Sequence, residues 1–395
     1  MTPPKKGPLD GLLVADFSRV VAGPYATMLL GDLGAEVIKV ERPEGGDDTR
    51  GFGPPFVGGQ SSYYLSINRN KRGVAWDLST EEGRRKAFQL AVRADVVVEN
   101  FRPGTAAKFG LGYQDVAAAN AKVVYCSVSG FGTSGEGAKL PGYDFLVQGV
   151  GGLMSITGDP GGEPRKVGVA VVDVLTAQFA TSAILAALYE RQQSGRGQRV
   201  EVNLLSSLLS ALINQASTYV TTGAVPKAMG NDHPSISPYE TFHTADRLLV
   251  IAVGNDPQFR GLAEAIGLGW MADDDRFATN AARVSNRAVL VELLEGRLRT
   301  RPASDWLGSI QAAGIPGGTV NDIGEAFALA HRLGLEPVLN LDRAGRVSPR
   351  SPDAPAGEAQ VRSPMGFSQT PATYRYAPPL LGEHTSEVER ELGIA

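Results

Sequence analysis

An aspartate at the start of a long apolar helix is the first candidate for covalent chemistry. Asp173 closes the run KVGVAVVD and precedes VLTAQFATSAILAALYERQQ, where a predicted strand gives way to a predicted helix. A carboxylate in this position is expected to cap the helix by accepting backbone N–H bonds. The same donors and the helix dipole would keep the carboxylate ionised, which is its nucleophilic form. A capping role and a nucleophilic role for Asp173 are therefore compatible.

The N-terminal segment has the layout of a nucleotide-binding fold without its glycine pattern. GLLVADF, PYATMLLGDLG and AEVIKVE predict a strand, a helix and a second strand that ends at Glu41. The loop from Ser18 to Pro24 lacks the spaced glycines that let a backbone approach a pyrophosphate. A nicotinamide or flavin dehydrogenase is therefore disfavoured, although Arg42 stands at the end of a strand where open parallel sheets bind ligands.

The composition excludes several classes of partner. The chain has 38 basic and 42 acidic residues, a formal net charge of −4, which lacks the basic excess of a nucleic-acid-binding protein. The lone cysteine, Cys126, excludes an internal disulfide framework and cysteine-rich metal sites. The four histidines show no metal-ligand spacing, so we expect no metal site.

The ends and the apolar runs predict a cytoplasmic, soluble protein with no membrane partner. The first residues, MTPPKKGPLDG, contain neither an apolar signal core nor an arginine-rich amphipathic leader. No later apolar stretch is expected to be long enough to cross a bilayer.

The chain is expected to be an α/β protein. Apolar runs without alternation, such as DVVVENF and KVVYCSV, are separated by helical segments such as TEEGRRKAFQLAVRA, a pattern that predicts a parallel sheet covered on both faces. We predict a large domain over residues 1–222, a smaller α+β domain over residues 223–330, where proline interrupts a mixed pattern, and a segment over residues 331–395 that returns to the large domain.

Five segments give a family resemblance that runs nearly end to end. GDLGAEVIKVERP, NRNKRG, VENFRPG, GEPRKVGVAVVD and PPLLGEHT resemble the class III, or family III, CoA-transferases in order and separation. The phrases GDDTRGFGPPFVGG and SSYYLSINRNK are most similar to the succinyl-CoA:glutarate, or hydroxymethylglutarate, branch. The resemblance implies a large Rossmann-like domain, a small domain, and two chains interlocked like linked rings in a homodimer.

The resemblance also implies a mechanism and a set of site residues. Asp173 matches the aspartate that attacks an acyl-CoA, first giving a mixed anhydride and then an aspartyl-CoA thioester. CoA is then a substrate, and no cofactor is required. Positions that the resemblance assigns to CoA are Arg42, Asn100, Phe101, Arg102 and Lys108. Lys71, which forms a basic cluster with Arg69 and Arg72 in a predicted loop, is a further candidate for phosphate binding, although charge runs are usually solvated.

Two further positions bear on catalysis. Gly254, in AVGNDPQF, matches a glycine loop of the family that could stabilise an oxyanion, but here one glycine replaces a run of four, so a plain turn is an equal alternative. Tyr143 stands where racemases of the family carry a histidine, and tyrosine is a poor base near neutral pH. We expect Tyr143 to pack against the thioester or to donate a hydrogen bond, which disfavours the alternative of an α-methylacyl-CoA racemase.

The acids exchanged are left open by the sequence. Dicarboxylates are favoured, and a distal carboxylate would need a cation such as Arg19, Arg50 or Arg165. Formyl-CoA with oxalate, carnitine esters and bile acid esters stay as alternatives, as does a CoA-binding protein without turnover.

Overall fold

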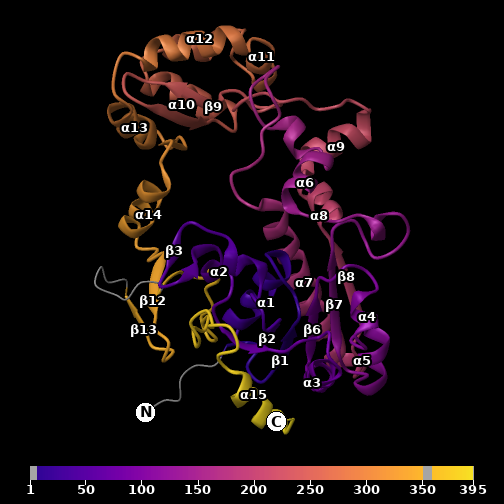
Figure 1. Ribbon diagram of the computed structural model, residues 1–395. Helices are drawn as coiled ribbons and strands as arrows, with labels where there is room; N and C mark the ends of the chain where they lie inside the picture. The colour runs from indigo at the N-terminus through magenta and orange to yellow at the C-terminus, as the bar shows by residue number, and fades with distance from the viewer. Residues whose placement is uncertain (1–6, 350–357, 395) are drawn as a thin grey trace. The chain divides into compact units, whose positions relative to one another are not determined.

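Two compact units make up the chain. The computed structural model describes residues 7–349 and 358–394 (Figure 1). The first unit comprises Met1–Leu153, Lys166–Ala224 and Glu336–Ala395, and the second comprises Met154–Arg165 and Val225–Leu335. Residues 154–165, which the sequence placed in the large domain, belong by their contacts to the second unit.

A six-stranded sheet forms the centre of the first unit. Its order is β5-β2-β1-β6-β7-β8 and all neighbouring strands are parallel. The strands are β1 Leu13–Asp16, β2 Glu36–Glu41, β5 Lys71–Ala75, β6 Val96–Glu99, β7 Val124–Ser129 and β8 Arg199–Asn203. The strand pairings confirm the predicted parallel sheet. Apolar strands buried in this way need helices over both faces of the sheet.

Helices cover both faces of this sheet, as the apolar runs predicted. Alternate strand residues enter two separate cores: Val96 and Val98 face one, whereas Val97 faces the other. The first core is closed by α1 Ala22–Asp32, α7 Val171–Ser194 and α8 Leu204–Ala211, and the second by α3 Glu81–Ala91, α5 Tyr113–Ala119 and α15 Thr385–Leu392. Thr80 caps α3 by accepting a hydrogen bond from the Gly83 N–H at 3.0 Å.

Helix α7 corrects one expectation from the sequence. Its 24 residues are long and apolar enough to cross a membrane by length and composition, contrary to the expectation that no stretch would be. However, half of its most apolar window is buried inside the fold, where Ala177, Ala180 and Ile184 pack in the first core. This partial burial is typical of a core helix of a folded domain.

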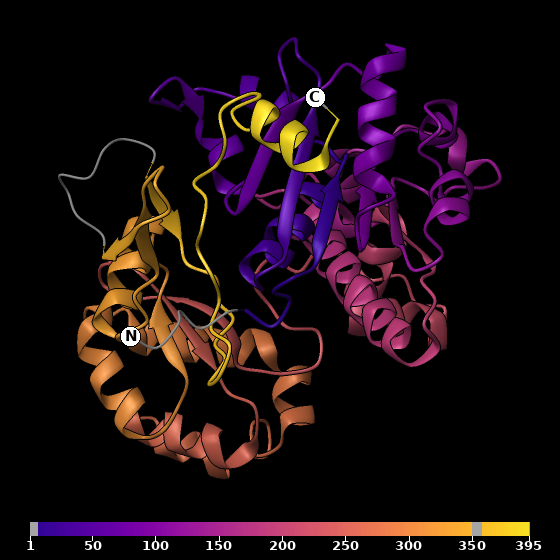
Figure 2. The ribbon, with the colours of Figure 1, turned by 90° about the horizontal axis from the view of Figure 1, so that it is seen from below.

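The C-terminal residues pack onto the N-terminal half of the first unit. Helix α15 lies against the sheet region of β5 and α3 (Figure 2). Arg72 of β5 joins Glu36 to Glu387 and Glu391 of α15 through contacts of 2.6 to 3.0 Å. The sequence placed Lys71 and Arg72 in a loop, but both belong to β5. These charged residues can lie in a central strand since Asp16 and Glu36 neutralise them inside the fold.

The other elements of the first unit are short. They are η1 Asp48–Gly51, β3 Phe56–Val57, β4 Gln60–Ser61, α2 Ser62–Ser66, α4 Thr105–Lys108, η2 Gly137–Lys139, α6 Asp144–Val150, α9 Ile213–Thr222, β12 Val338–Leu341, β13 Val347–Pro349 and β14 Ala359–Val361, with η3 Leu153–Ile156 at the boundary between the units. Strands β13, β12 and β14 form a small antiparallel sheet in that order.

The second unit has its own sheet and core. Its antiparallel sheet has the order β11-β10-β9, from β9 Tyr239–His243, β10 Leu248–Ala252 and β11 Gly317–Thr319. The helices are α10 Asp256–Ala265, η4 Gly269–Asp273, α11 Asn280–Ser285, α12 Arg287–Leu298, α13 Ala303–Ala312 and α14 Ile323–Arg332. Phe259, Leu294 and Trp306 are buried in a core separate from those of the first unit.

Candidate active site

A cavity of about 260 Å³ opens at the carboxyl ends of the central strands. The cavity lies beside β1, which pairs with β2 on one side and with β6 on the other. At β1 the order of the strands along the sheet changes direction. In open parallel sheets this reversal point is where ligands bind. The cavity brings together five of the residues assigned from the sequence: Asn100, Phe101, Arg102, Tyr143 and Asp173.

Asp173 is the third residue of α7, and not its cap as the sequence predicted. The N-cap is Ala170, which has no side-chain capping bond. The capping carboxylate is that of Asp144, whose Oδ1 accepts hydrogen bonds from the N–H groups of Val172 and Asp173 at 2.7 and 3.2 Å. The Asp173 carboxylate is therefore not used to close its own helix.

Asp144 is itself held in place by a short chain of polar contacts. Its Oδ2 accepts a hydrogen bond from Gln148 Nε2 at 2.6 Å, and Gln148 Oε1 accepts one from the Val167 N–H at 2.9 Å. Gln148 is buried and lies one helical turn after Asp144 on α6. These contacts tie α6 to the segment that leads into α7, and so fix the backbone from which Asp173 projects.

The electrostatic surroundings of Asp173 also differ from the expectation. Burial, together with the nearby charge of Asp144, raises the pKa of the Asp173 carboxyl to about 7. Among the described residues, none donates a hydrogen bond to its carboxylate oxygens. The ionised carboxylate is therefore poorly solvated, whereas the sequence predicted that helix N–H groups would stabilise it.

Two loops at the cavity are joined by Asn100. Its Oδ1 accepts a hydrogen bond from the Arg19 N–H at 2.8 Å, and its Nδ2 donates one to the Arg19 carbonyl at 2.7 Å. This pair of bonds fixes the loop after β1 to the loop after β6. Asn100 thus shapes the cavity, and the loop that follows it carries Phe101 and Arg102 into the wall.

Residue Val20 of the same loop has an unusual backbone. Its φ is +67°, in the left-handed region that is costly for a β-branched residue. Its N–H donates to Asp47 Oδ1 at 3.3 Å, and Val20 lines the cavity. Strain of this kind persists only where surrounding contacts enforce it, which is typical of functional loops.

Phe101 stands at the junction of three cavities. It lines the cavity of Asp173, a second of about 250 Å³ that Arg42 also lines, and a third of about 410 Å³. Arg19 is shared by the first two cavities and Arg102 by the first and the third. In the part of the chain that is described, the Arg102 guanidinium has no hydrogen-bond or ion-pair partner, so it is available to an anion.

Lys71 and Lys108 do not join this group. Lys71 is fully buried, and its Nζ donates to Asp16 Oδ2, the Pro24 carbonyl and Asn68 Oδ1 at 2.8 to 3.0 Å. A phosphate cannot reach an ammonium whose donors are all used inside the fold, so the structure contradicts a CoA contact by Lys71. Lys108 is exposed at the end of α4 and lines none of the three cavities.

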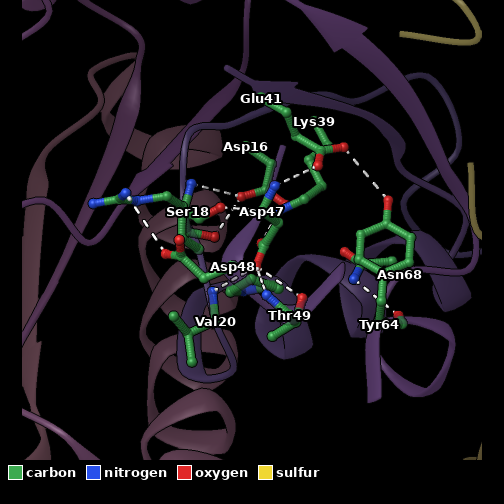
Figure 3. Close-up of polar contacts among 12 residues, drawn as sticks. Asp16, Ser18, Val20, Lys39, Glu41, Asp47, Asp48, Thr49, Tyr64 and Asn68 are labelled. Atoms are coloured by element: carbon green, nitrogen blue, oxygen red, sulfur yellow. Dashed lines mark hydrogen bonds and ion pairs between the residues drawn. The ribbon is translucent and has the colours of Figure 1, made fainter. Parts of the chain in front are cut away.

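Buried ion pairs beneath the cavity explain why Lys71 is internal. Asp16 pairs with Lys71, and Asp47 pairs with Lys39 at 2.8 Å, with all four side chains inaccessible (Figure 3 shows Asp16, Lys39 and Asp47). Lys39 Nζ also donates to the Ser18 carbonyl at 2.9 Å. Because each buried charge is paired and hydrogen-bonded, the cluster can hold the strained loop in one conformation.

The cations considered for a distal carboxylate are separated. Arg50 donates from Nε and Nη2 to the two carboxylate oxygens of Glu41, both at 2.7 Å. Arg165 belongs to the second unit. Arg19 is therefore the one of these three arginines that lines the cavity with Asp173.

Asp144 and Tyr63 lie near Asp173 but were not predicted as site residues from the sequence. Burial, followed by the charges of Asp173 and Asp144, raises the pKa of the Tyr63 hydroxyl, which places Tyr63 in the surroundings of the same carboxylates. Its ring packs edge to face on Phe52, with centroids 5.6 Å apart. Both aromatic residues fall in the phrases that resembled the glutarate branch, so that resemblance held the signal for them.

Gly254 lies in the second unit, in the turn after β10. Its N–H donates to Gln258 Oε1 at 2.7 Å, and a Cβ built there would meet only that oxygen, at 3.4 Å. We expect Gly254→Ala to retain CoA-transfer activity within about threefold, as a plain turn would. Steady-state kinetics check this, and a loss greater than about thirtyfold, with an unchanged unfolding temperature, would favour the oxyanion or mobile-loop role.

Comparisons with known proteins converge on one family. The model of CoA-transferase family III matches residues 9–385. The chain is 43% identical to a succinate–glutarate CoA-transferase of Agrobacterium fabrum, covering 99% of this chain and 97% of that protein. It is 39% identical to a human succinyl-CoA:glutarate CoA-transferase, covering 98% and 86%, and 40% identical to an acetyl-CoA:oxalate CoA-transferase of Acetobacter aceti, covering 83% and 85%. The crystal structure of a CAIB/BAIF family protein from Brucella suis superposes with a TM-score of 0.85 at 41% identity, covering 98% of this chain and all of that one.

Proposed function

Because the chain belongs to CoA-transferase family III, we propose that it moves CoA from succinyl-CoA, or another dicarboxyl-CoA, to a second carboxylic acid with Asp173 as the nucleophile. That it is an enzyme of the CoA-transferase type follows from its family and its near full-length relatives. The observation that carries the proposal is a poorly solvated carboxylate in a cavity lined by arginines and by the start of a helix.

Covalent catalysis divides the transfer into four balanced steps. Asp173 attacks the thioester carbonyl, forming an acyl-aspartyl anhydride and breaking the carbon–sulfur bond to release CoA thiolate. The thiolate attacks the aspartyl carbonyl, giving an aspartyl-CoA thioester and the first acid as its carboxylate. The second acid attacks this thioester, forming a new anhydride and breaking the carbon–sulfur bond to release CoA thiolate again. The thiolate then attacks the new acyl carbonyl. This last attack frees Asp173 as a carboxylate and releases the new acyl-CoA.

Each addition step creates an oxyanion that needs hydrogen-bond donors. Helix α1 begins at the same cavity, through Val21 and Ala22, and has no side-chain cap at its N-terminus. Uncapped N–H groups and the positive end of the helix dipole are suited to developing negative charge. We assign oxyanion stabilisation first to this helix start, with Gly254 as the alternative, and place Tyr143 as a hydrogen-bond donor or packing surface for the thioester.

CoA is proposed to run across the shared wall of the cavities. Arg42, Arg19 and Arg102 supply guanidinium groups for its phosphates, with Lys108 as an outer cation. Phe101, at the junction, offers an aromatic face to the adenine or to the pantetheine arm. Of the three arginines considered for the distal carboxylate of a dicarboxylic acid, Arg19 alone borders Asp173. In that alternative, Arg42 and Arg102 bind the phosphates without it.

The pKa of Asp173 makes a direct prediction for the pH dependence. The ionised carboxylate is the nucleophile, so activity rises as the pH increases through the raised pKa of about 7. We expect kcat/KM to fall about tenfold per pH unit below about pH 7 and to be flat from about pH 8. Initial rates between pH 5.5 and pH 8.5 check this, and a profile flat over that range would show that Asp173 has an ordinary pKa.

We also propose that the protein is a homodimer, that it needs no cofactor and that it acts in the cytoplasm. Large apolar side chains are open to solvent along α9, among them Ile213 and Val220 with 72% and 80% of their surface exposed. Exposed apolar surface of this extent is typical of an interface. An interlocked pair of chains would cover it, and light scattering of the purified protein measures the assembly.

Other acids and another reaction stay as alternatives. The similarity to an acetyl-CoA:oxalate CoA-transferase keeps small acids such as oxalate open. An α-methylacyl-CoA racemase is opposed by tyrosine at position 143. Incubation with succinyl-CoA and isotope-labelled glutarate, oxalate and carnitine, followed by mass spectrometry, decides among the acids. Exchange of an α-proton with deuterated water in the absence of any acyl transfer would favour the racemase instead.

A further inference from the structure

Asp48 is a fixed anion among the cations at the boundary of two cavities. Its Oδ1 lies 2.7 Å from Arg42 Nη2, and its Oδ2 lies 3.8 Å from Arg19 Nη1. Asp48 lines the cavity of Asp173, Arg42 lines the neighbouring cavity, and Arg19 lines both. A carboxylate therefore sits between the two guanidinium groups proposed to bind phosphate.

The backbone that carries Asp48 is held rigidly. The preceding residue, Asp47, is buried and accepts hydrogen bonds from Lys39 Nζ, from the Thr49 N–H and from Thr49 Oγ at 2.8 to 2.9 Å (Figure 3). Lys39 and Thr49 are themselves fully buried. Asp48 thus projects from a rigid base toward solvent, where 37% of its side chain is exposed.

The two arginines are freer than the aspartate between them. The side chains of Arg19 and Arg42 are 43% and 52% exposed, and among the described residues each forms its ion pair with Asp48. A long guanidinium side chain can swing toward an arriving phosphate, whereas a short carboxylate on a fixed backbone cannot follow it. Binding of a phosphate therefore exchanges one anion for another on the same cations.

From this arrangement we infer that Asp48 is a built-in counter-ion that competes with the phosphates of CoA for Arg42 and Arg19, and so sets how tightly the enzyme holds the nucleotide end of its substrate. This inference rests on the proposed function, because it takes the phosphates to bind at these arginines. An enzyme that must release an acyl-CoA product in every cycle benefits from a phosphate site that does not bind too tightly.

Removal of the Asp48 charge should strengthen the binding of CoA, although loss of a residue that lines a site usually weakens binding. Asp48→Asn keeps the shape of the side chain and removes the competing charge. We expect it to bind CoA and adenosine 3′,5′-bisphosphate about three- to tenfold more tightly, as for the loss of a partly exposed ion pair and of like-charge repulsion. The gain should shrink between about 50 mM and about 500 mM salt, because exposed charges are screened.

Titration calorimetry on the intact protein tests this with a matched control. Asp275 is exposed, belongs to the second unit and lines none of the three cavities, so Asp275→Asn is expected to stay within about twofold of the wild type. A second test is the loss of CoA affinity caused by Arg42→Gln. This loss should be about threefold larger in the Asp48→Asn background, where Arg42 no longer has a competing anion.

The binding measurements separate failure of the Asp48 inference from failure of the proposed function. Equal or weaker binding of the bisphosphate by Asp48→Asn, with wild-type binding intact, would overturn the inference and show that Asp48 orients the arginines instead. Absence of CoA binding by the wild-type protein would instead contradict the proposed function. Tighter binding that is independent of salt would also overturn the inference, because competition between charges must weaken with ionic strength.

Discussion

Asp173→Asn is expected to lower the rate of CoA transfer by about 10⁴-fold or more while the chain stays folded. The amide has the shape of the carboxylate but cannot form the anhydride or the aspartyl-CoA thioester. Because the described residues donate no hydrogen bond to the Asp173 side chain, its replacement removes no described contact of that carboxylate. The turnover number with succinyl-CoA and a saturating acid measures the effect, and loss of less than about tenfold would exclude a nucleophilic role.

The same variant should be more stable than the wild type at alkaline pH. The folded pKa of about 7 lies above the ordinary value, so the folded chain binds more protons than the unfolded chain between about pH 4 and pH 7. Stability therefore falls as the pH rises through this window, and the asparagine variant avoids that loss. We expect Asp173→Asn to gain roughly 1–3 kcal/mol at pH 8 and little at pH 4. The exposed Asp275 provides a control variant, Asp275→Asn, expected to change nothing, and an unstable Asp173→Asn at pH 8 would contradict the account.

Asp144→Ala has the second-largest expected effect, although Asp144 acts through Asp173. Removal of its carboxylate leaves the N–H groups of Val172 and Asp173 without their cap and frees Gln148 from its partner. A displaced nucleophile is costly, because catalysis depends on the near-attack geometry of the reacting atoms. We expect kcat to fall about hundredfold, with KM for the acyl-CoA changed much less.

Asp144→Asn separates the two roles of this residue. Asparagine can still accept the two capping bonds through Oδ1, and it lacks the charge that helps to raise the pKa of Asp173. Its Nδ2 cannot accept the bond that Gln148 Nε2 donates to Asp144 Oδ2, so this one contact is lost as well. The acid limb of the pH profile should therefore move to lower pH, with most of kcat at pH 8 retained. Rates from pH 5 to pH 8.5 measure this shift. An acid limb at the wild-type position would show that burial alone sets the pKa of Asp173.

The apolar runs predicted the sheet well because a strand buried on both faces has a continuous apolar sequence. Val96, Val97 and Val98 are such a run, and they enter two different cores. The same rule, that buried strands are apolar, gave a wrong prediction for Lys71, because its charge favoured a loop. A lysine can occupy a buried strand only when a distant partner such as Asp16 neutralises it, and a local pattern does not reveal that partner.

The candidate site was predictable where one segment carries both the residue and its surroundings. Asn100, Phe101 and Arg102, which the resemblance assigned to CoA, follow one strand and line one cavity. The capping of α7 was not predictable in this way, because the carboxylate comes from Asp144, which lies 28 residues before Val172. The sequence therefore singled out Asp173 as the candidate nucleophile, but the pKa of its carboxyl also depends on Asp144, which only the fold brings near.

Detection of CoA bonded to Asp173 is the most direct test of the proposed mechanism. The purified enzyme is mixed with succinyl-CoA in the absence of an acceptor acid, quenched in acid, digested and mapped by mass spectrometry. We predict that the peptide containing Asp173 gains the mass of CoA less one water, as an aspartyl-CoA thioester, and that Asp173→Asn gains nothing. Active transfer without any adduct on this peptide, or with an adduct on another residue, would contradict the account.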